Sequence, residues 1–301
     1  MQLYVWQGEK TNFGDELNNW LMPKIFPGLF DDDASAIFLG IGSVIFDFHP
    51  ASSLKIVYGA GYGGYTPLPR FDDTWRFYCV RGPRTARACG LGAEMVAGDT
   101  AILINKFRAA SKQRAGLSFM PHYDSVPRGH WAMACELAGV RYIDPRAPVE
   151  DVLDAIESSE ALIAEAMHGA IVADALRVPW IPLRPVHATH RMKWRDWAEA
   201  LDLELKPVAL WPSSTAEAWV TLKGGAGDGA GFRTARGPLG AGVRALDWGF
   251  VRLAAARLAQ LTKIAPILSS DLAIARSVER LEHHADEIRR DWAAGRLLKR
   301  A

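Results

Sequence analysis

The sequence predicts an α/β protein made of two similar halves with a ligand cleft between them. Three observations support this prediction. Short apolar runs alternate with loops or helix-like stretches, the alternation starts again after the basic stretch at residues 105–116, and the composition becomes rich in glycine after Trp211-Pro212. Such alternation is typical of parallel sheets covered by helices. The 301 residues suffice for two domains of common size.

The first half, residues 1–110, is predicted to be an N-terminal α/β domain. Its strands are expected at residues 3–6, 37–39, 55–58 and 77–80, which are short and apolar. The stretch Asn12-Phe13-Gly14-Asp15-Glu16-Leu17 follows the first strand and begins a helix. Gly14 permits a close backbone approach. Asp15 either caps this helix or acts as a base at its mouth.

The second half, residues 111–212, is predicted to be a C-terminal α/β domain. Its strands are expected at residues 117–120, 140–143, 161–164 and 180–183, with helices at 131–138 and 149–158. Residues 213–242 are rich in glycine and are expected to be a flexible linker. Residues 243–301 are expected to form two helices, at about 243–263 and 270–295. The adjacent His283 and His284 on the second helix do not share a face, so we expect no metal site there.

Composition and motifs disfavour several classes of protein. The 35 lysines and arginines nearly balance the 34 aspartates and glutamates, so no overall field points to nucleic acid as a partner. The three cysteines have no CxxC or metal-ligand spacing, which favours a reducing, cytoplasmic setting. We expect neither a signal peptide nor a membrane span. The sequence contains no HExxH, GxSxG, Walker or zinc-ligand pattern, which argues against metalloproteases, serine hydrolases and P-loop enzymes.

A glycine-rich stretch follows the third predicted strand. Gly59-Ala60-Gly61-Tyr62-Gly63-Gly64 matches the GxGxxG pattern of dinucleotide sites. Pro67 and Pro69 prevent the helix that such a site requires, and no acidic residue follows at the right distance. We therefore expect a substrate-facing loop around Gly61.

Arg81-Gly82-Pro83-Arg84-Thr85 is the end of a strand that runs into a helix, because Pro83 suits the first helical turn. Two guanidinium groups at this place could clamp a phosphate or a carboxylate. The alternative is a salt bridge to an acidic neighbour such as Asp99.

Other basic groups follow strands of the second half. His122 ends the first of these strands and is expected to face the cleft. Arg191 and Lys193 come just after the last strand, where they could bind a second anion, although a solvated loop has the same composition. His168 lies at the turn between the strand at residues 161–164 and a helix, beside unpaired helix amides that favour anions. It either faces an anionic substrate or merely caps or packs the turn.

The motifs, in their order along the chain, resemble those of the polysaccharide pyruvyl transferase family, and most closely the exopolysaccharide ketal-pyruvate transferases. The resemblance spans about residues 2–193. The motifs are Asn12 to Leu17, Arg81 to Thr85, Gly98-Asp99-Thr100-Ala101, Pro121-His122-Tyr123 and Met167-His168-Gly169-Ala170. The resemblance implies two Rossmann-like halves facing a cleft, as in GT-B glycosyltransferases. It also implies that phosphoenolpyruvate, as the donor substrate and with no cofactor, gives its pyruvyl group to two hydroxyls of one sugar, forming a cyclic ketal and releasing phosphate.

The resemblance assigns roles to particular residues. The family's functional arginine, histidine and lysine correspond to Arg81, His168 and Lys193. We expect His168 to be the general acid, or to hydrogen-bond the leaving phosphate, and we choose Asp15 as the general base. The expected substrate-binding residues are Asn12, Gly14, Gly61, Arg84, His122, Met167, Gly169, Arg191 and Lys193.

One position departs from the family. Many members have arginine two residues before the histidine, where this chain has Ala166. Either Arg81, Arg84 or Arg191 replaces the missing cation, or the donor binds differently.

Two other functions stay open: a glycosyltransferase that uses a nucleotide-sugar, and a carbohydrate-binding relative without activity. The expected acceptor is an oligosaccharide, free or lipid-linked, at the inner face of the membrane, with peripheral membrane contact and no membrane span. The C-terminal helices could close the cleft, form a dimer or touch the membrane.

Overall fold

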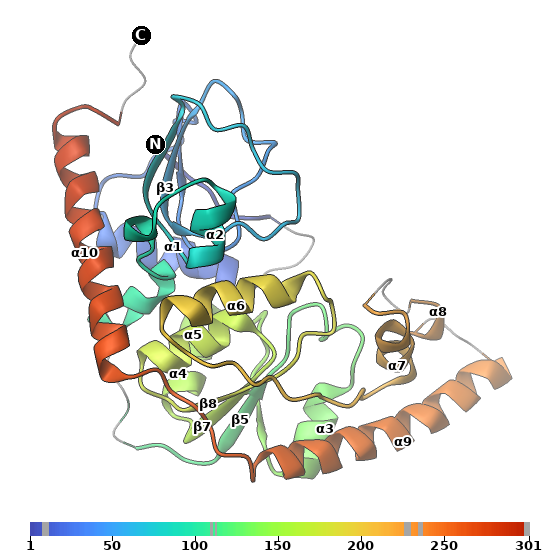
Figure 1. Ribbon diagram of the computed structural model, residues 1–301. Helices are drawn as coiled ribbons and strands as arrows, with labels where there is room; N and C mark the ends of the chain where they lie inside the picture. The colour runs from blue at the N-terminus through green and yellow to red at the C-terminus, as the bar shows by residue number, and fades with distance from the viewer. Residues whose placement is uncertain (8–11, 109–110, 112, 226–229, 234–236, 298–301) are drawn as a thin grey trace. The chain divides into compact units, whose positions relative to one another are not determined.

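A computed structural model describes residues 1–7, 12–108, 111, 113–225, 230–233 and 237–297 (Figure 1). Contacts between residues divide the chain into two compact units, each discontinuous in sequence. Unit 1 contains Met1–Ala109, Met192–Leu205 and Ser269–Ala301, and unit 2 contains Ala110–Arg191 and Lys206–Leu268.

Unit 1 is built on a parallel four-stranded sheet. The strands are β1 (Gln2–Leu3), β2 (Ala36–Leu39), β3 (Leu54–Ala60) and β4 (Trp75–Val80), in that spatial order. Every residue of β2 is buried and nearly every residue of β3, as is typical of a parallel sheet covered on both faces. All four predicted strands are therefore confirmed, although β1 is shorter and β3 and β4 are longer than expected.

Helices from both ends of the sequence pack in unit 1. They are α1 (Phe13–Ile25), α2 (Pro83–Ala88), the 3-10 helices η1 (Ala93–Met95) and η2 (Thr100–Lys106), most of α6 (His190–Ala200), and α10 (Asp271–Ala293). The Tyr58 hydroxyl of β3 donates a hydrogen bond of 2.8 Å to the carbonyl of Leu281 on α10. Ser277 of α10 donates to the carbonyl of Ala97 at 2.5 Å. The last helix is thus an integral part of the first unit.

Unit 2 contains a second parallel sheet. Its strands are β5 (Leu117–Met120), β6 (Arg141–Tyr142), β7 (Ala161–Ala164) and β8 (Trp180–Pro182), in the order β6-β5-β7-β8. The connecting helices are α3 (Trp131–Ala138), α4 (Val149–Glu157) and α5 (Met167–Ala175). Strands and helices occur here in the predicted order. The prediction of an α/β protein with parallel sheets is confirmed.

The residues after Trp211 are more helical than their composition suggests. They form α7 (Thr215–Leu222), α8 (Ala230–Arg233) and α9 (Gly237–Leu261), while residues 226–229 of the glycine-rich stretch lie outside the described part. α7 begins where the Ser214 side chain accepts a hydrogen bond from the Glu217 amide at 3.0 Å. Part of the segment expected as a flexible linker is therefore a capped helix.

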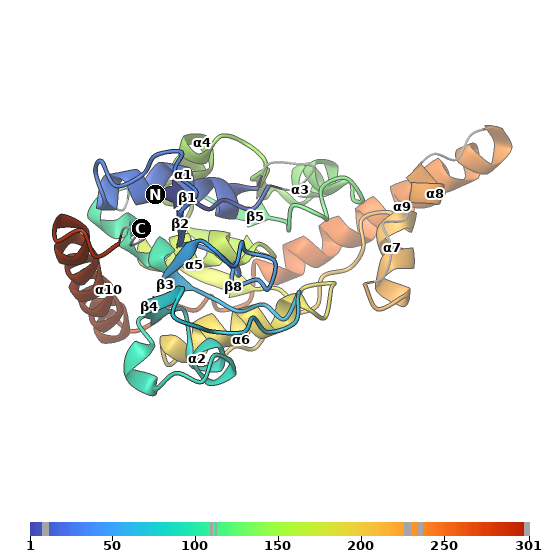
Figure 2. The ribbon, with the colours of Figure 1, turned by 90° about the horizontal axis from the view of Figure 1, so that it is seen from above.

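α9 belongs to unit 2. Its later residues Val251, Ala254, Leu258 and Leu261 join Phe119 and Ile163 of the sheet in one buried core. Figures 1 and 2 show α3 beside the middle of α9, and α7 beside its earlier turns. No helix of the described residues has both the length and the apolar character needed to cross a bilayer.

Candidate functional site

The candidate residues of unit 2 gather at the carboxyl edge of its sheet. β5 and β7 are paired so that Met120 lies opposite Ala164, the last residue of each strand. The residues that follow, His122 on one side and Glu165 and His168 on the other, therefore leave the sheet at the same edge. This is the edge at which open α/β sheets bind ligands.

His168 is the second residue of α5, at the predicted strand-to-helix turn. Its side chain is partly exposed, whereas the neighbours Met167 and Gly169 are buried. A Cβ at Gly169 would lie only 2.6 Å from the Met120 sulfur, so a glycine lets the helix start close to β5. Ala166 occupies the cap position and makes no side-chain cap bond. His168 is thus more exposed than its neighbours, although its Nε2 is buried.

Glu165 fixes the loop that follows β5. It is 3% exposed, and its two oxygens accept hydrogen bonds from the His122 amide at 2.9 Å and from the Ser125 hydroxyl at 3.1 Å. The Ser125 amide donates to the His122 carbonyl at 2.8 Å, which closes a turn. A buried carboxylate that is saturated in this way holds His122 in one backbone position.

Asp124 lies between two histidines of this edge. Its Oδ2 is 3.4 Å from His122 Nδ1 and 3.9 Å from His190 Nε2, and the two imidazole rings stack with centroids 4.6 Å apart. Burial raises the pKa of Asp124, but the hydrogen bond and charge of His122 and the charges of Arg128 and His190 outweigh burial and lower the pKa to about 2. Asp124 is therefore ionised at neutral pH.

Arg128 is a buried cation without a carboxylate partner. The side chain is 6% exposed, its Nη2 donates to the Ser125 hydroxyl at 3.2 Å, and its Nη1 is 3.2 Å from His187 Nε2. Among the described residues it makes no ion pair with an acid, and its Nε has no hydrogen-bond partner. Burial and the Arg128 charge both lower the pKa of His187. A buried charge in this condition is costly unless an anion binds to it.

No sequence pattern pointed to Arg128. It lies in a loop well after the end of β5, outside every recognised motif, and its contact with His187 joins residues 59 positions apart. The burial of Arg128 could not be predicted either, because a polar loop is expected to be exposed to solvent.

Arg81 and Arg84, the expected site arginines of unit 1, are already paired with acids. Arg81 is completely buried, with its Nε 3.0 Å from Asp196 Oδ2 and its Nη1 donating to the Ser43 hydroxyl at 2.9 Å. Gly61 leaves room for this guanidinium, because a Cβ there would lie 2.2 Å from Arg81 Cζ. Arg84 forms an ion pair with Glu199 at 2.5 Å, which raises the pKa of Arg84.

The salt-bridge alternative for Arg81 therefore holds, with a different acid from the one expected. Asp99 instead caps η2 by accepting from the Ala101 amide at 3.0 Å. Asp196 also accepts from the Arg84 amide at 2.9 Å and from the Thr85 hydroxyl at 2.6 Å, at the start of α2. A carboxylate of α6 thus occupies the helix start where a substrate anion was expected.

Asn12, Gly14 and Asp15 share the first turn of α1. The Asn12 side chain accepts from the Gly14 amide at 3.1 Å and donates to Asp15 Oδ2 at 3.0 Å. Asn12 is therefore the cap, and Asp15 is not. The side-chain amide of Asn12 thus orients the carboxylate of Asp15 at the carboxyl end of β1.

The expected site residues divide between the units. Unit 1 holds Asn12, Gly14, Asp15, Gly61, Arg81, Arg84 and Lys193, and unit 2 holds His122, Met167, His168, Gly169 and Arg191. Lys193 is partly buried in α6, and Arg191 is exposed.

Two groups of described residues could hold a metal ion: His122, Asp124 and His190, and on α10 His283, His284 and Glu287. On α10 the two histidines are adjacent in sequence, yet both reach Glu287, with His284 Nδ1 at 2.7 Å and His283 Nε2 at 3.7 Å. The expectation that they act separately ignored this shared acid.

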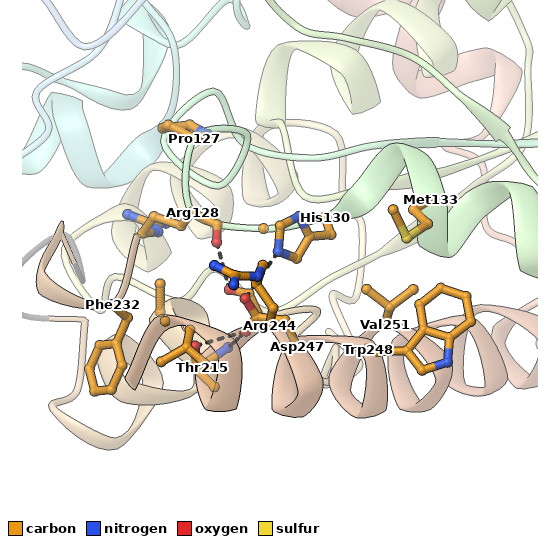
Figure 3. A pocket seen from close by; sticks show the side chains of 15 residues that line it. Pro127, Arg128, His130, Met133, Thr215, Phe232, Arg244, Asp247, Trp248 and Val251 are labelled. Atoms are coloured by element: carbon orange, nitrogen blue, oxygen red, sulfur yellow. Dashed lines mark hydrogen bonds and ion pairs between the residues drawn. The ribbon is translucent and has the colours of Figure 1, made fainter. Parts of the chain in front are cut away.

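A cavity of about 430 Å³ lies within unit 2, between the loop after β5 and helices α7 and α9 (Figure 3). Asp247 lies on the polar side of this cavity. Its carboxylate accepts a hydrogen bond from the Thr215 amide at 2.7 Å and lies 3.3 Å from His130 Nε2. Trp248 and Val251 form part of its apolar side. None of the residues selected from the sequence lines it.

The sequence pattern of the family described as Polysaccharide pyruvyl transferase matches residues 12–185, from the cap of α1 to just beyond β8. This chain belongs to the polysaccharide pyruvyl transferase family. The transferase is also 35% identical to the succinoglycan biosynthesis protein ExoV of Rhizobium meliloti (strain 1021), over 319 aligned residues that cover 97% of this chain and 100% of that protein. No solved structure shows a match to the transferase.

Proposed function

We propose that the transferase moves a pyruvyl group from phosphoenolpyruvate to a sugar of a bacterial exopolysaccharide repeat unit and forms a cyclic pyruvate ketal. Family membership and the succinoglycan biosynthesis protein support the class of reaction. The structural observation that carries the proposal is in unit 2, where His168 begins a helix and the buried Arg128, which forms no ion pair among the described residues, lies in the loop after β5.

The donor carries a phosphate and a carboxylate, so it needs two groups of donors. Arg128 supplies a guanidinium whose Nε has no partner among the described residues, and the first amides of α5 supply a second, partly positive group.

The chemistry uses one acid and one base. His168 donates a proton to C3 of phosphoenolpyruvate, which makes C2 electrophilic, and a sugar hydroxyl then bonds to C2. Asp15 accepts the proton of that hydroxyl. The C2–O bond to phosphate breaks, phosphate leaves with the bonding electrons, and the second hydroxyl bonds to C2 as its proton is released. No electrons are gained or lost, so the reaction as written needs no redox cofactor.

Because Asp15 and His168 belong to different units, the proposal includes a GT-B-like arrangement in which the units face each other across a cleft. The acceptor in this proposal is an oligosaccharide, free or lipid-linked, at the cytoplasmic face of the membrane.

The proposal is tested by incubating the purified transferase with phosphoenolpyruvate and unpyruvylated repeat-unit oligosaccharide. We expect release of inorganic phosphate and an acetal methyl signal in the NMR spectrum of the product. His168→Ala should lower kcat by about 10²–10⁴-fold, the usual contribution of a general acid or base, with an unchanged circular dichroism spectrum. Exposed His283→Ala is the matched control. Undiminished turnover in His168→Ala would remove the histidine from the mechanism, and transfer from a nucleotide-sugar instead of phosphoenolpyruvate would replace the function.

A further inference from the structure

The group His122, Asp124 and His190 brings two imidazoles and one carboxylate to a single point at the edge of the second sheet. One ligand atom of each residue lies within 4.8 Å of the others. Zinc binds nitrogen and oxygen ligands at about 2.0–2.2 Å, so two ligands of one tetrahedral ion stand roughly 3.3–3.5 Å apart. The separation of 3.4 Å between Asp124 Oδ2 and His122 Nδ1 is already within this range, and His190 Nε2, at 3.9 Å, needs only a small rotation.

The orientation of His122 also suits a cation. Its Nδ1 lies 3.4 Å from both the backbone amide and Oδ2 of Asp124. A lone pair that faces a carboxylate oxygen is repelled by it unless a proton or a cation lies between them. If a proton lies between the nitrogen and the carboxylate oxygen, the group is only an ion pair. If a metal ion lies between them, the group is a metal site.

The local charge favours the cation. The charged side chains around this group are Asp124 itself, Arg128, whose charge acts on Asp124, and Glu165, which accepts from the His122 amide. Two carboxylates therefore face one guanidinium when the imidazoles are neutral, and the excess negative charge is screened by a bound dication.

The ligands are held in place by their surroundings. The Glu165 carboxylate binds the His122 amide at 2.9 Å, and the Ser125 turn that follows is tied to Arg128. The His190 amide donates to the His187 carbonyl at 3.2 Å as α6 begins. Outer hydrogen bonds of this kind orient the ligands of a metal and are a feature of built sites.

We infer that His122, Asp124 and His190 form a binding site for a divalent first-row transition metal such as zinc or cobalt. Two histidines and one carboxylate are a frequent ligand set for these ions, and they leave coordination positions open for water or an oxyanion. Sequence analysis predicted no such site, because two of the ligands lie on the loop after β5 and the third begins α6.

The test measures metal binding without substrate. Full-length transferase is treated with a chelator, desalted and titrated with Zn²⁺ in competition with a chromogenic chelator, and with Co²⁺, whose visible absorption reports nitrogen and oxygen coordination. The wild type should bind one ion per chain in the competition. Asp124→Asn, which keeps the side-chain volume, and His190→Ala should each weaken binding by at least about tenfold and abolish the cobalt spectrum.

The second group on α10 provides the control. His283→Ala with His284→Ala removes both histidines of the other described cluster and should leave the measured affinity and spectrum unchanged. The inference is overturned if the wild type does not compete for zinc, if Asp124→Asn binds as tightly as the wild type, or if only the α10 variant loses the ion. A transferase that binds the metal but does not use phosphoenolpyruvate would refute the proposed function and leave this site intact.

Discussion

The carboxyl edges of the two sheets carry similar residues, but the buried arginines at the two edges have different partners. In unit 1, Arg81 is buried against Asp196, and Arg84 is joined to Glu199. In unit 2, Arg128 is also buried, but within the described part of the chain it forms no ion pair and hydrogen-bonds to a hydroxyl and an imidazole. In a buried ion pair, each charge compensates the other. A buried cation without an acidic partner is compensated only when an anion binds to it. The first edge is thus organised for rigidity, and the second for binding.

The largest effect should come from breaking the buried pair of unit 1. Asp196→Ala leaves Arg81 as an uncompensated buried charge and also removes the acceptor of the Arg84 and Thr85 amides. Removing one partner of a buried pair typically costs about 3–5 kcal/mol of unfolding free energy. Urea unfolding followed by circular dichroism measures this loss. A change below about 1 kcal/mol would mean that Arg81 is not held mainly by Asp196.

A smaller effect of a different kind is expected at Arg128. Arg128→Gln breaks no ion pair among the described residues, so the unfolding free energy should fall far less than in Asp196→Ala. The variant loses charge-assisted hydrogen bonds to the donor, which are worth about 1.5–3 kcal/mol, so KM for phosphoenolpyruvate should rise by about 10- to 100-fold.

The control for Arg128 is Arg146→Gln in the same unit, since Arg146 is paired with Asp144 at 2.6 Å and is not part of the sheet edge. Calorimetric titration with inorganic phosphate and with pyruvate tells which end of the donor Arg128 binds. Unchanged KM together with a large loss of stability would make Arg128 a structural residue like Arg81, and the contrast between the two edges would disappear.

These contrasts mark what could be predicted from the sequence. The α/β class and the strands followed from local apolar patterns. The helix at residues 131–138 was predicted with its observed bounds, and in the structure Gly139 ends it in the left-handed conformation (φ 68°). The pairing of Arg81 with Asp196 joins residues 115 positions apart, and no local pattern encodes it. α7 was missed because the glycines after it dominate the composition, although Ser214 is an ordinary cap. The position of His168 after a strand could thus be predicted, whereas contacts with a partner far along the chain could not.

The smallest effect is expected at the exposed pair of unit 1. Glu199→Gln removes the partner of Arg84, yet the two side chains are 36% and 41% exposed, so water replaces the lost contact. Exposed pairs contribute about 0–1 kcal/mol, and the unfolding free energy should change by no more than that, with a further decrease of the effect at high salt. The same urea experiment as for Asp196→Ala measures it. Both acids lie on α6 and differ mainly in burial. A loss of unfolding free energy as large as that of Asp196→Ala would therefore show that the whole α2–α6 contact, and not the buried charge of Arg81, stabilises this edge.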